Sequence, residues 1–159
     1  MKNLIRFFLI GLLTAGVGIA GKAQLINGSF IKGANLPWLD GSYNTWIGVD
    51  PHQPTWGCSY NSTHMNQYLA DMHNMGITVV RIWVNQDDEG CTIDGNDYVT
   101  GVTSLFWDNL DNCVQLAANN GVKLYITLNN GRADWLYTPA QADAYKNKCL
   151  IPMIQRYKG

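Results

Sequence analysis

Apolar and polar residues follow one another along this chain in a pattern that occurs three times. Residues 30–36 (FIKGANL), 77–84 (ITVVRIWV) and 122–128 (VKLYITL) are short apolar stretches, and the last two are rich in β-branched residues, which predicts strands. Each stretch is followed by a loop and then by apolar positions at helical spacing, with a repeat of about 45 residues. Strands that alternate with helices predict a parallel sheet with right-handed crossovers.

Three helices are predicted from the residues at their ends. The first covers residues 61–76, which begin with three good capping residues (Asn, Ser, Thr) and end at a glycine. The second covers residues 104–121 and ends at an Asn-Gly pair. The third begins at Thr138 and Pro139, because proline suits the first helical turn. Pro152 should kink or interrupt this last helix.

The loop lengths separate two α/β fold classes. The long loops all follow strands and the helix-to-strand turns are short, as in a (β/α)8 TIM barrel, whereas an open doubly wound sheet is the alternative. A barrel needs about 250 residues. We therefore expect residues 24–159 to be the incomplete amino-terminal portion of a TIM-barrel domain, with about the first three βα units present. A small three-unit sheet stays open as the alternative.

Residues 1–23 have the three parts of a secretory signal peptide. Lys2 and Arg6 supply the positive start, residues 7–20 the apolar stretch, and small residues follow before a cleavage point. A membrane anchor is the alternative, but this stretch is shorter than the roughly 20 apolar residues that a membrane-spanning helix needs. We expect a secreted or periplasmic protein that is not held in a membrane after signal cleavage.

The charge balance bears on the partners of the exported part. Without Lys2, Arg6 and Lys22, eight of the eleven basic residues remain against twelve acidic ones, so the net charge is −4. No basic residues cluster in the sequence. Nucleic acid is excluded as an expected partner, because binding it requires concentrated Lys and Arg.

The four cysteines, Cys58, Cys91, Cys113 and Cys149, all belong to the exported part, where disulfides persist. Three pairings are possible, and the spacing does not decide among them. A Cys58–Cys91 bridge is the preferred pairing, because both residues fall in predicted loops. There is no C-x-x-C motif and no His/Cys cluster, so we expect neither a metal site nor a cofactor.

Strand alternation separates a polar face from an aliphatic face, because successive side chains of a strand point to opposite sides. In the second strand, Arg81 and Trp83 share one face and the other face is aliphatic. The polar side of the third strand carries Tyr125, Thr127 and Asn129. In a barrel the polar face points inward, where a buried guanidinium requires a partner, most naturally a carboxylate.

Most of the tryptophans fall in loops that follow strands, where a substrate site is expected. Trp38, Trp46, Trp56 and Trp135 fall in loops after strands, and Trp83 lies near a strand end. Aromatic platforms in a polar groove suit a sugar, which has apolar C–H faces and a rim of hydroxyls. Packing of the long loops is the alternative role for any one of them.

Four segments resemble one known group of enzymes. GANLPWLDG, MGITVVRIWV, FWDNLDNCVQLAANNGVKLYITLNNG and IPMIQRYKG are similar, in their order and spacing, to the amino-terminal part of the clan A glycoside hydrolases, in particular the family 5 cellulases and β-mannanases. The resemblance implies a secreted hydrolase that cleaves β-linked polysaccharide, with polysaccharide or oligosaccharide as its substrate. It covers nearly all of residues 30–159.

The resemblance also implies roles for individual residues. Arg81 matches an arginine that orients the nucleophilic carboxylate, and Trp38 matches a loop position in the sugar groove. Asn129 and Asn130 follow the third strand, where many relatives have a histidine or another polar ligand. Together with the loop tryptophans, the expected substrate-binding residues are Trp38, Trp46, Trp83, Asn129, Asn130 and Trp135.

The two glutamates of the retaining mechanism that the resemblance implies follow the fourth and seventh strands, beyond the residues of this chain. The chain contains one glutamate, Glu89, in the loop after the second strand. We expect Asp87, Asp88 and Glu89 to form a solvated acidic turn or a loose calcium contact. The chain alone is therefore expected to be inactive, with no catalytic residue of its own.

Two other functions stay open. A short secreted carbohydrate-binding protein without catalysis would use the same loop tryptophans. A small doubly wound regulatory or redox domain would require a glycine-rich phosphate loop or a reactive cysteine after the first strand. The segment GANLPW offers neither, so carbohydrate binding is the stronger alternative.

Overall fold

The computed structural model describes residues 30–40, 45–128 and 138–158. Residues from Lys32 onward form one compact unit. The predicted signal peptide at residues 1–23 lies outside the described residues. Among the described residues, no helix is long and apolar enough to cross a membrane.

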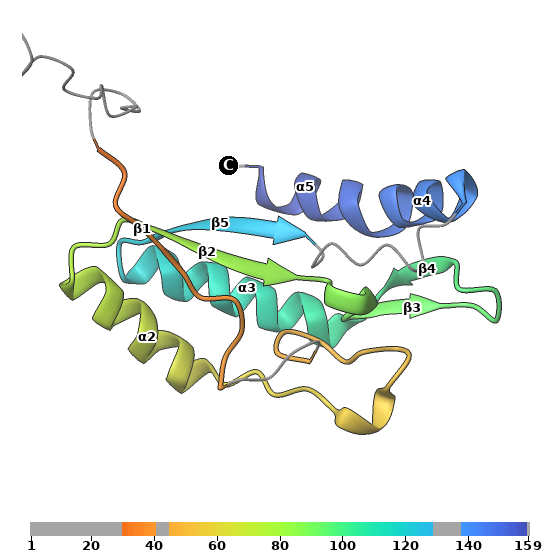
Figure 1. Cartoon of the computed structure of the whole chain (residues 1–159), viewed down its shortest axis with the longest axis horizontal. Helices are drawn as coiled ribbons and strands as arrows, with labels where there is room; N and C mark the ends of the chain where they lie inside the picture. The colour runs from red at the N-terminus through yellow and green to blue at the C-terminus, as the bar shows by residue number, and fades with distance from the viewer. Residues whose placement is uncertain (1–29, 41–44, 129–137, 159) are drawn as a thin grey trace, which may run out of the picture. The chain divides into compact units, whose positions relative to one another are not determined.

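A three-stranded parallel sheet forms the centre of the fold (Figure 1). Its strands are β1 (Gly33–Asn35), β2 (Val79–Val84) and β5 (Lys123–Leu128), in the order β1-β2-β5. All three predicted strands are present and both pairings are parallel, as the alternation of strands and helices predicted. The fold is therefore mixed α/β around a small parallel sheet.

The two helices that connect these strands begin and end as their sequences predicted. α2 (Ser62–Asn74) is capped by Asn61, whose side chain accepts hydrogen bonds from two backbone N–H groups of the first turn. α3 (Ser104–Asn119) is capped by Thr103. Each helix is followed by a glycine with positive φ, Gly76 at 78° and Gly121 at 67°, a conformation that glycine adopts without steric cost.

The third helix is interrupted near Pro152, as predicted. It consists of α4 (Pro139–Tyr145), a π-helical segment η3 (Lys146–Leu150) and α5 (Ile151–Tyr157). Thr138 and Gln141 form a capping box at its start. A proline lacks the N–H that would continue α-helical hydrogen bonding, and its ring collides with the carbonyl four residues earlier. The wider π turn immediately before Pro152 accommodates this conflict.

The loop predicted at residues 85–103 contains regular structure that the sequence did not indicate. A short helical turn, η2 (Gln86–Asp88), follows β2, and an antiparallel hairpin comes after it. The hairpin pairs β3 (Cys91–Ile93) with β4 (Val99–Val102). Its turn is held by Asp94, whose side chain accepts hydrogen bonds from two backbone N–H groups. A second short helix, η1 (Pro54–Trp56), lies in the loop between β1 and α2.

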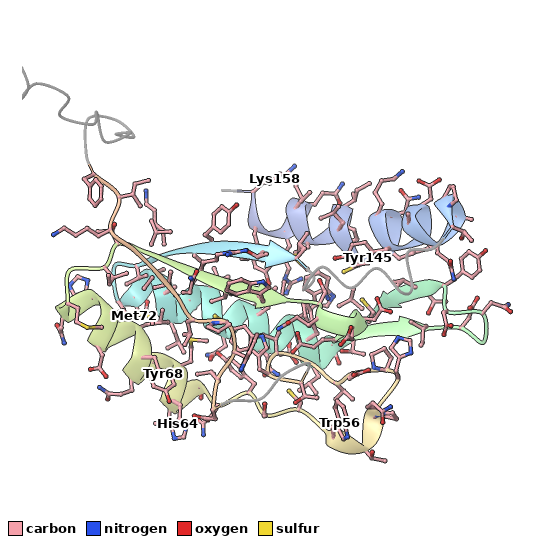
Figure 2. All side chains as sticks on the ribbon, in the orientation of Figure 1. Trp56, His64, Tyr68, Met72, Tyr145 and Lys158 are labelled. Atoms are coloured by element: carbon pink, nitrogen blue, oxygen red, sulfur yellow. The ribbon has the colours of Figure 1, made fainter. Side chains whose placement is uncertain are left out.

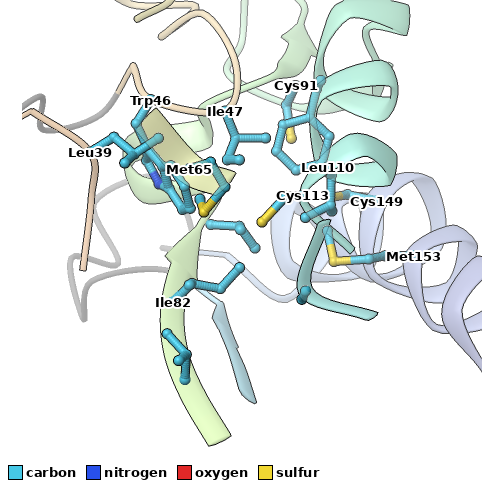
Figure 3. Packing of buried hydrophobic residues seen from close by; sticks show 14 of the residues in the cluster. Leu39, Trp46, Ile47, Met65, Ile82, Cys91, Leu110, Cys113, Cys149 and Met153 are labelled. Atoms are coloured by element: carbon cyan, nitrogen blue, oxygen red, sulfur yellow. The ribbon is translucent and has the colours of Figure 1, made fainter. Parts of the chain in front are cut away.

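The hydrophobic core lies on one face of the sheet. Val80, Ile82 and Val84 of β2 are fully buried, while the residues between them are only half-buried. The helices contribute Met65 and Leu69 from α2 and the following residues from α3: Phe106, Leu110, Cys113 and Ala117. Figure 3 shows this packing around Ile82. Burial of each such aliphatic side chain stabilises the fold by roughly 1.5–3 kcal/mol.

The third helix covers the same face. Ile126 and Leu128 of β5 pair in register with Ile82 and Val84, so they point to the buried side. They line an apolar groove of about 300 Å³ together with residues of η3 and α5, among them Leu150, Met153, Ile154 and Tyr157. Helices therefore pack against one side of the sheet, in contrast to a doubly wound fold, where they cover both sides.

The tightest backbone approach lies where the loop after β1 meets the turn after β2. Gly90 has φ +78°, and a Cβ at this position would lie 2.1 Å from the Phe106 ring. A Cβ on Gly48 would lie 2.6 Å from the Gly90 Cα atom. Glycine is therefore required on both sides of this contact.

We expect Gly90→Ala to destabilise the fold by about 2–4 kcal/mol, because the substitution adds positive-φ strain to overpacking against Phe106. Gly95→Ala is the control, since Gly95 is exposed and an added Cβ meets nothing within 4 Å. Urea unfolding of the purified chain measures both. Equal midpoints for the two variants would contradict the prediction.

Candidate functional site

The face of the sheet opposite the helices carries polar and aromatic side chains in two rows. Asn35, Arg81 and Tyr125 are register partners on β1, β2 and β5, and Trp83 and Thr127 are partners one step further along. The alternation of β2 and β5 predicted this face correctly. Because the strands are parallel, these rows approach the carboxyl ends of the strands, where sites of parallel α/β folds lie.

Arg81 is held at the centre of this face by its two neighbours. Its Nε donates a hydrogen bond of 2.7 Å to Thr127 Oγ1, and its Cζ lies 3.9 Å from the centroid of the Trp83 ring. Cation–π contact and the hydrogen bond together fix the plane of the guanidinium. In the part of the chain that the structure describes, no carboxylate forms an ion pair with Arg81.

Tyr125 is the aromatic residue of this face that the substrate-binding prediction omitted. It lies beside Arg81 in the sheet, and its side chain is 60% exposed. Strand alternation had already placed it on the polar side, so the signal was present in the sequence. An exposed aromatic ring next to an oriented guanidinium is able to stack on one face of a polar ring.

The prediction for Trp46 is wrong. Its side chain is fully buried, and its Nε1 donates a hydrogen bond of 2.7 Å to the Trp83 carbonyl. Trp46 therefore fastens the loop after β1 to the end of β2 and has no surface for a substrate. This is the packing role that was the alternative for each loop tryptophan.

The other predicted substrate-binding residues differ in their placement. Trp83 is half-buried, with one face of its ring covered by Arg81. Trp38 is also half-buried and packs against the core, so a substrate contact there stays a prediction. Asn129, Asn130 and Trp135 lie outside the described residues. Trp56, which was not among the predicted site residues, projects from η1 with 59% of its side chain exposed (Figure 2).

The acidic turn after β2 is buried, so the expectation of a solvated turn is wrong. Asp88 and Glu89 are fully buried and Asp87 is 8% exposed. Glu89 Oε1 accepts hydrogen bonds from the backbone N–H groups of Ile47 at 2.5 Å and Gly48 at 3.0 Å. This carboxyl group therefore joins the turn after β2 to the loop after β1, which we call the Glu89 clasp.

The backbone of this turn is strained. Asn85, Asp87 and Asp88 have φ of 56°, 47° and 64°, all in the left-handed region that non-glycine residues rarely adopt. The Asn85 side chain compensates in part by donating a hydrogen bond of 2.9 Å to the Glu89 carbonyl. Such strain persists only where the surrounding contacts fix the conformation, and here the Glu89 clasp supplies them.

Burial changes the acidity of two carboxyl groups in the turn. Loss of solvation raises the pKa of Glu89 to about 7, against the lowering effect of the backbone N–H groups of Gly48 and Ile47. Burial also raises the pKa of Asp88 to about 6, although its contact with His52, 3.2 Å from Asp88 Oδ2 to Nε2, acts in the opposite direction. Both groups thus retain a proton at higher pH than in the unfolded chain.

These carboxyl groups are not a catalytic pair. A raised pKa is a property of many general acids, but Glu89 is sealed from solvent and its clasp already engages the backbone. A calcium contact is not supported either, because the described residues contain no group of three or more His, Cys, Asp or Glu side chains able to hold a metal ion. The turn is a structural support for the site.

The predicted Cys58–Cys91 disulfide is absent from the structure. All four cysteines are free thiols. Cys91 is buried at the start of β3, beside Asn85, whereas the Cys58 sulfur lies 3.4 Å from the amide nitrogen of Asn109 on α3. The two thiols therefore have different neighbours. Loop placement alone did not reveal this, because the residue predicted in a loop is part of a hairpin.

The fold of this chain is similar to that of a solved glycoside hydrolase structure. The X-ray structure of β-mannanase from the blue mussel Mytilus edulis matches 78% of this chain with a TM-score of 0.63 and 23% sequence identity. The chain spans 36% of the length of that structure. No protein-family model matches the sequence. No curated protein sequence matches it significantly either. The likeness at this identity is one of fold.

The raised pKa of Glu89 predicts a pH-dependent stability. Between pH 4.5, its ordinary pKa, and about 7, the folded protein retains a proton that the unfolded chain releases, so the free energy of unfolding falls as pH rises. The full effect is about 3 kcal/mol. Asp88 contributes in the same direction only up to about pH 6.

We therefore expect Glu89→Gln to abolish the decline between pH 6 and 7, since a glutamine oxygen still accepts the two backbone N–H groups. Urea titrations across this range measure the change. Asp108→Asn, at an exposed position on α3, should retain the wild-type slope. An unchanged slope in Glu89→Gln would show that Glu89 does not titrate in this window.

Proposed function

We propose that this chain is the amino-terminal portion of a secreted glycoside hydrolase that cleaves β-linked polysaccharide of the cellulose or mannan class. The observation that carries the proposal is the polar face around Arg81 on a parallel sheet whose helices lie on the other side. The fold likeness to a β-mannanase structure supports it independently. We further propose that export follows from the signal peptide at residues 1–23.

One-sided helix packing supports a barrel wall. In a TIM barrel the helices form an outer ring, and the other face of each strand points inward. Here β2 and β5 present their aliphatic side chains to the helices and Arg81, Trp83, Tyr125 and Thr127 to the other side. An open doubly wound sheet would need apolar residues on both faces. The three βα units are therefore best explained as part of a barrel.

In this proposal Arg81 orients the nucleophilic carboxylate. Thr127 and Trp83 fix the guanidinium plane, which leaves its terminal N–H groups in a fork that matches a carboxylate. The positive charge lowers the pKa of such a partner and keeps it ionised. Arg81 is thus a positioning residue, and the nucleophile lies beyond the described residues.

The aromatic residues of this face would supply the sugar contacts. Tyr125 is exposed directly beside Arg81, and the Trp83 indole lies next to it in the adjoining row. A sugar ring that stacks on Tyr125 would place its hydroxyl groups near the guanidinium. Trp38 remains a predicted contact from the loop after β1.

The proposed reaction is retaining hydrolysis, which uses two carboxyl groups about 5 Å apart, one as nucleophile and one as acid/base. The only glutamate of this chain is buried, and its carboxyl group is engaged in the Glu89 clasp. We therefore propose that both catalytic glutamates belong to further strands of the complete protein.

The test is to express the complete open reading frame from the source DNA and to assay soluble β-mannan and cellulose derivatives. Release of reducing sugars with retention of anomeric configuration is the expected result. The 159-residue chain assayed alone should give no hydrolysis above background. Turnover by this chain alone would overturn the proposed location of the glutamates. Retention on insoluble polysaccharide without turnover by the complete protein would favour a carbohydrate-binding protein.

We expect Arg81→Lys in the complete protein to lower kcat by about 10²–10³-fold with a small change in KM, because lysine lacks the planar fork that aligns the nucleophile. The acidic limb of kcat/KM should also move to higher pH, since alignment with the cation is lost.

Arg156→Lys is the matched control for this substitution. Arg156 also lies over a tryptophan ring, 5.2 Å from the Trp107 centroid, but it is on α5 and pairs with Asp111 at the surface. This variant should retain the wild-type pH profile. An Arg81→Lys enzyme with unchanged kcat and profile would remove Arg81 from the proposed mechanism.

A further inference from the structure

Two of the four free cysteines share one neighbour. Cys91 lies at the start of β3 and Cys149 in the π-helical segment η3, and their residues are 3% and 0% exposed. The Asn85 side-chain amide contacts both sulfurs, with Nδ2 3.8 Å from Cys91 Sγ and Oδ1 3.5 Å from Cys149 Sγ. The two thiols thus contact the same amide group. Figure 3 shows both cysteines among the buried residues of the core.

The acidity of Cys91 reflects the neighbouring cysteine. A side-chain hydrogen bond with Cys149, followed by burial, raises the pKa of the Cys91 thiol. The remaining cysteines have other surroundings. Burial alone raises the pKa of Cys113 to about 12, and Cys58 lies beside Asn109. The shared contact with the Asn85 amide therefore distinguishes Cys91 and Cys149 from the other two.

We infer that Cys91 and Cys149 form a disulfide when the protein folds under oxidising conditions. Their contacts with the one Asn85 amide place the two sulfurs in the same buried part of the fold. The inference replaces the Cys58–Cys91 pairing that loop placement had favoured. It does not depend on the proposed hydrolase activity, because it rests on the contacts of both sulfurs with Asn85 and on the packing of η3 against β4, the partner strand of β3.

The bond forms by thiol–disulfide exchange with an external disulfide. The thiolate of one cysteine attacks a sulfur of the external disulfide, which gives a mixed disulfide and releases one thiol. The second cysteine then loses its proton and attacks the protein sulfur of the mixed disulfide, which releases the second thiol. The two protein thiols are oxidised and the external disulfide is reduced to two thiols, so electrons and protons balance.

Burial determines when this reaction occurs. The thiolate is the attacking species, and a buried thiol with a raised pKa supplies little of it. The folded, reduced protein should therefore react slowly with an external disulfide. Exchange is faster while the chain folds and the sulfurs are still accessible, as in an export compartment.

The bridge would connect two distant parts of the chain. It closes a long loop that contains β4, α3, β5 and α4, and loops of this length gain more stability from a crosslink than short ones do. It would also fix η3 against the hairpin beside Asn85, the first strained residue of the turn that the Glu89 clasp holds.

The experiment is refolding of the whole chain in a mixture of oxidised and reduced glutathione. Intact mass and peptide mapping without reduction are the readouts. We expect a product lighter by two hydrogen atoms and a peptide that links Cys91 to Cys149. A linked peptide that joins Cys58 to Cys91, or four free thiols after refolding, would overturn the inference.

Two matched double variants test the pair in isolation. The variant Cys58→Ala with Cys113→Ala should still lose two hydrogen atoms, and its urea midpoint should fall when a reductant is added. The variant Cys91→Ala with Cys149→Ala should show a midpoint independent of reductant. A reductant-dependent midpoint in the second variant, or none in the first, contradicts the inference. Peptide mapping of the wild type decides the matter if a variant fails to fold.

Discussion

The hydrogen bonds from the backbone of Ile47 and Gly48 to the Glu89 carboxyl group hold together the part of the molecule on which the polar face depends. They join the loop after β1 to the turn after β2. Without this contact the left-handed residues of the turn would lose the packing that fixes them, and Trp46 would no longer be held against the end of β2. A buried carboxyl group is costly unless it is hydrogen-bonded, so the contact also explains how the Glu89 carboxyl group is tolerated there.

The sequence predicted the features that depend on local patterns. Alternation in VVRIWV and VKLYITL assigned the faces of β2 and β5, and capping residues fixed the ends of α2 and α3, because a few neighbouring positions determine these properties. The buried acidic turn and the position of Trp46 depend on partners about 40 positions away. Nothing within QDDEG indicates that backbone N–H groups of an earlier loop lie ready to receive a carboxyl group. The inferred pairing of Cys91 with Cys149 depends likewise on Asn85, which lies 64 positions before Cys149.

Arg81 shows how much of a site can be predicted from strand alternation. The pattern placed its side chain on the polar face, and the register supplied Thr127 and Trp83 as the groups that orient it. The same alternation placed Tyr125 on this face, but the expected substrate contacts were tryptophans and two asparagines and did not include it. A residue on a rigid strand is positioned more accurately than one on a loop, so the strand-borne pair of Arg81 and Tyr125 forms the firmest part of this surface.

The π-helical segment η3 determines which side of α5 faces the core. One extra residue within a helical turn rotates the next residues by about 100° around the helix axis. The wider π turn absorbs this extra residue, so the buried residues Tyr145 of α4, Cys149 of η3 and Met153 of α5 lie on one side of the helix. The π-helical segment thus lets one helix pack against the hairpin at its start and against the sheet at its end.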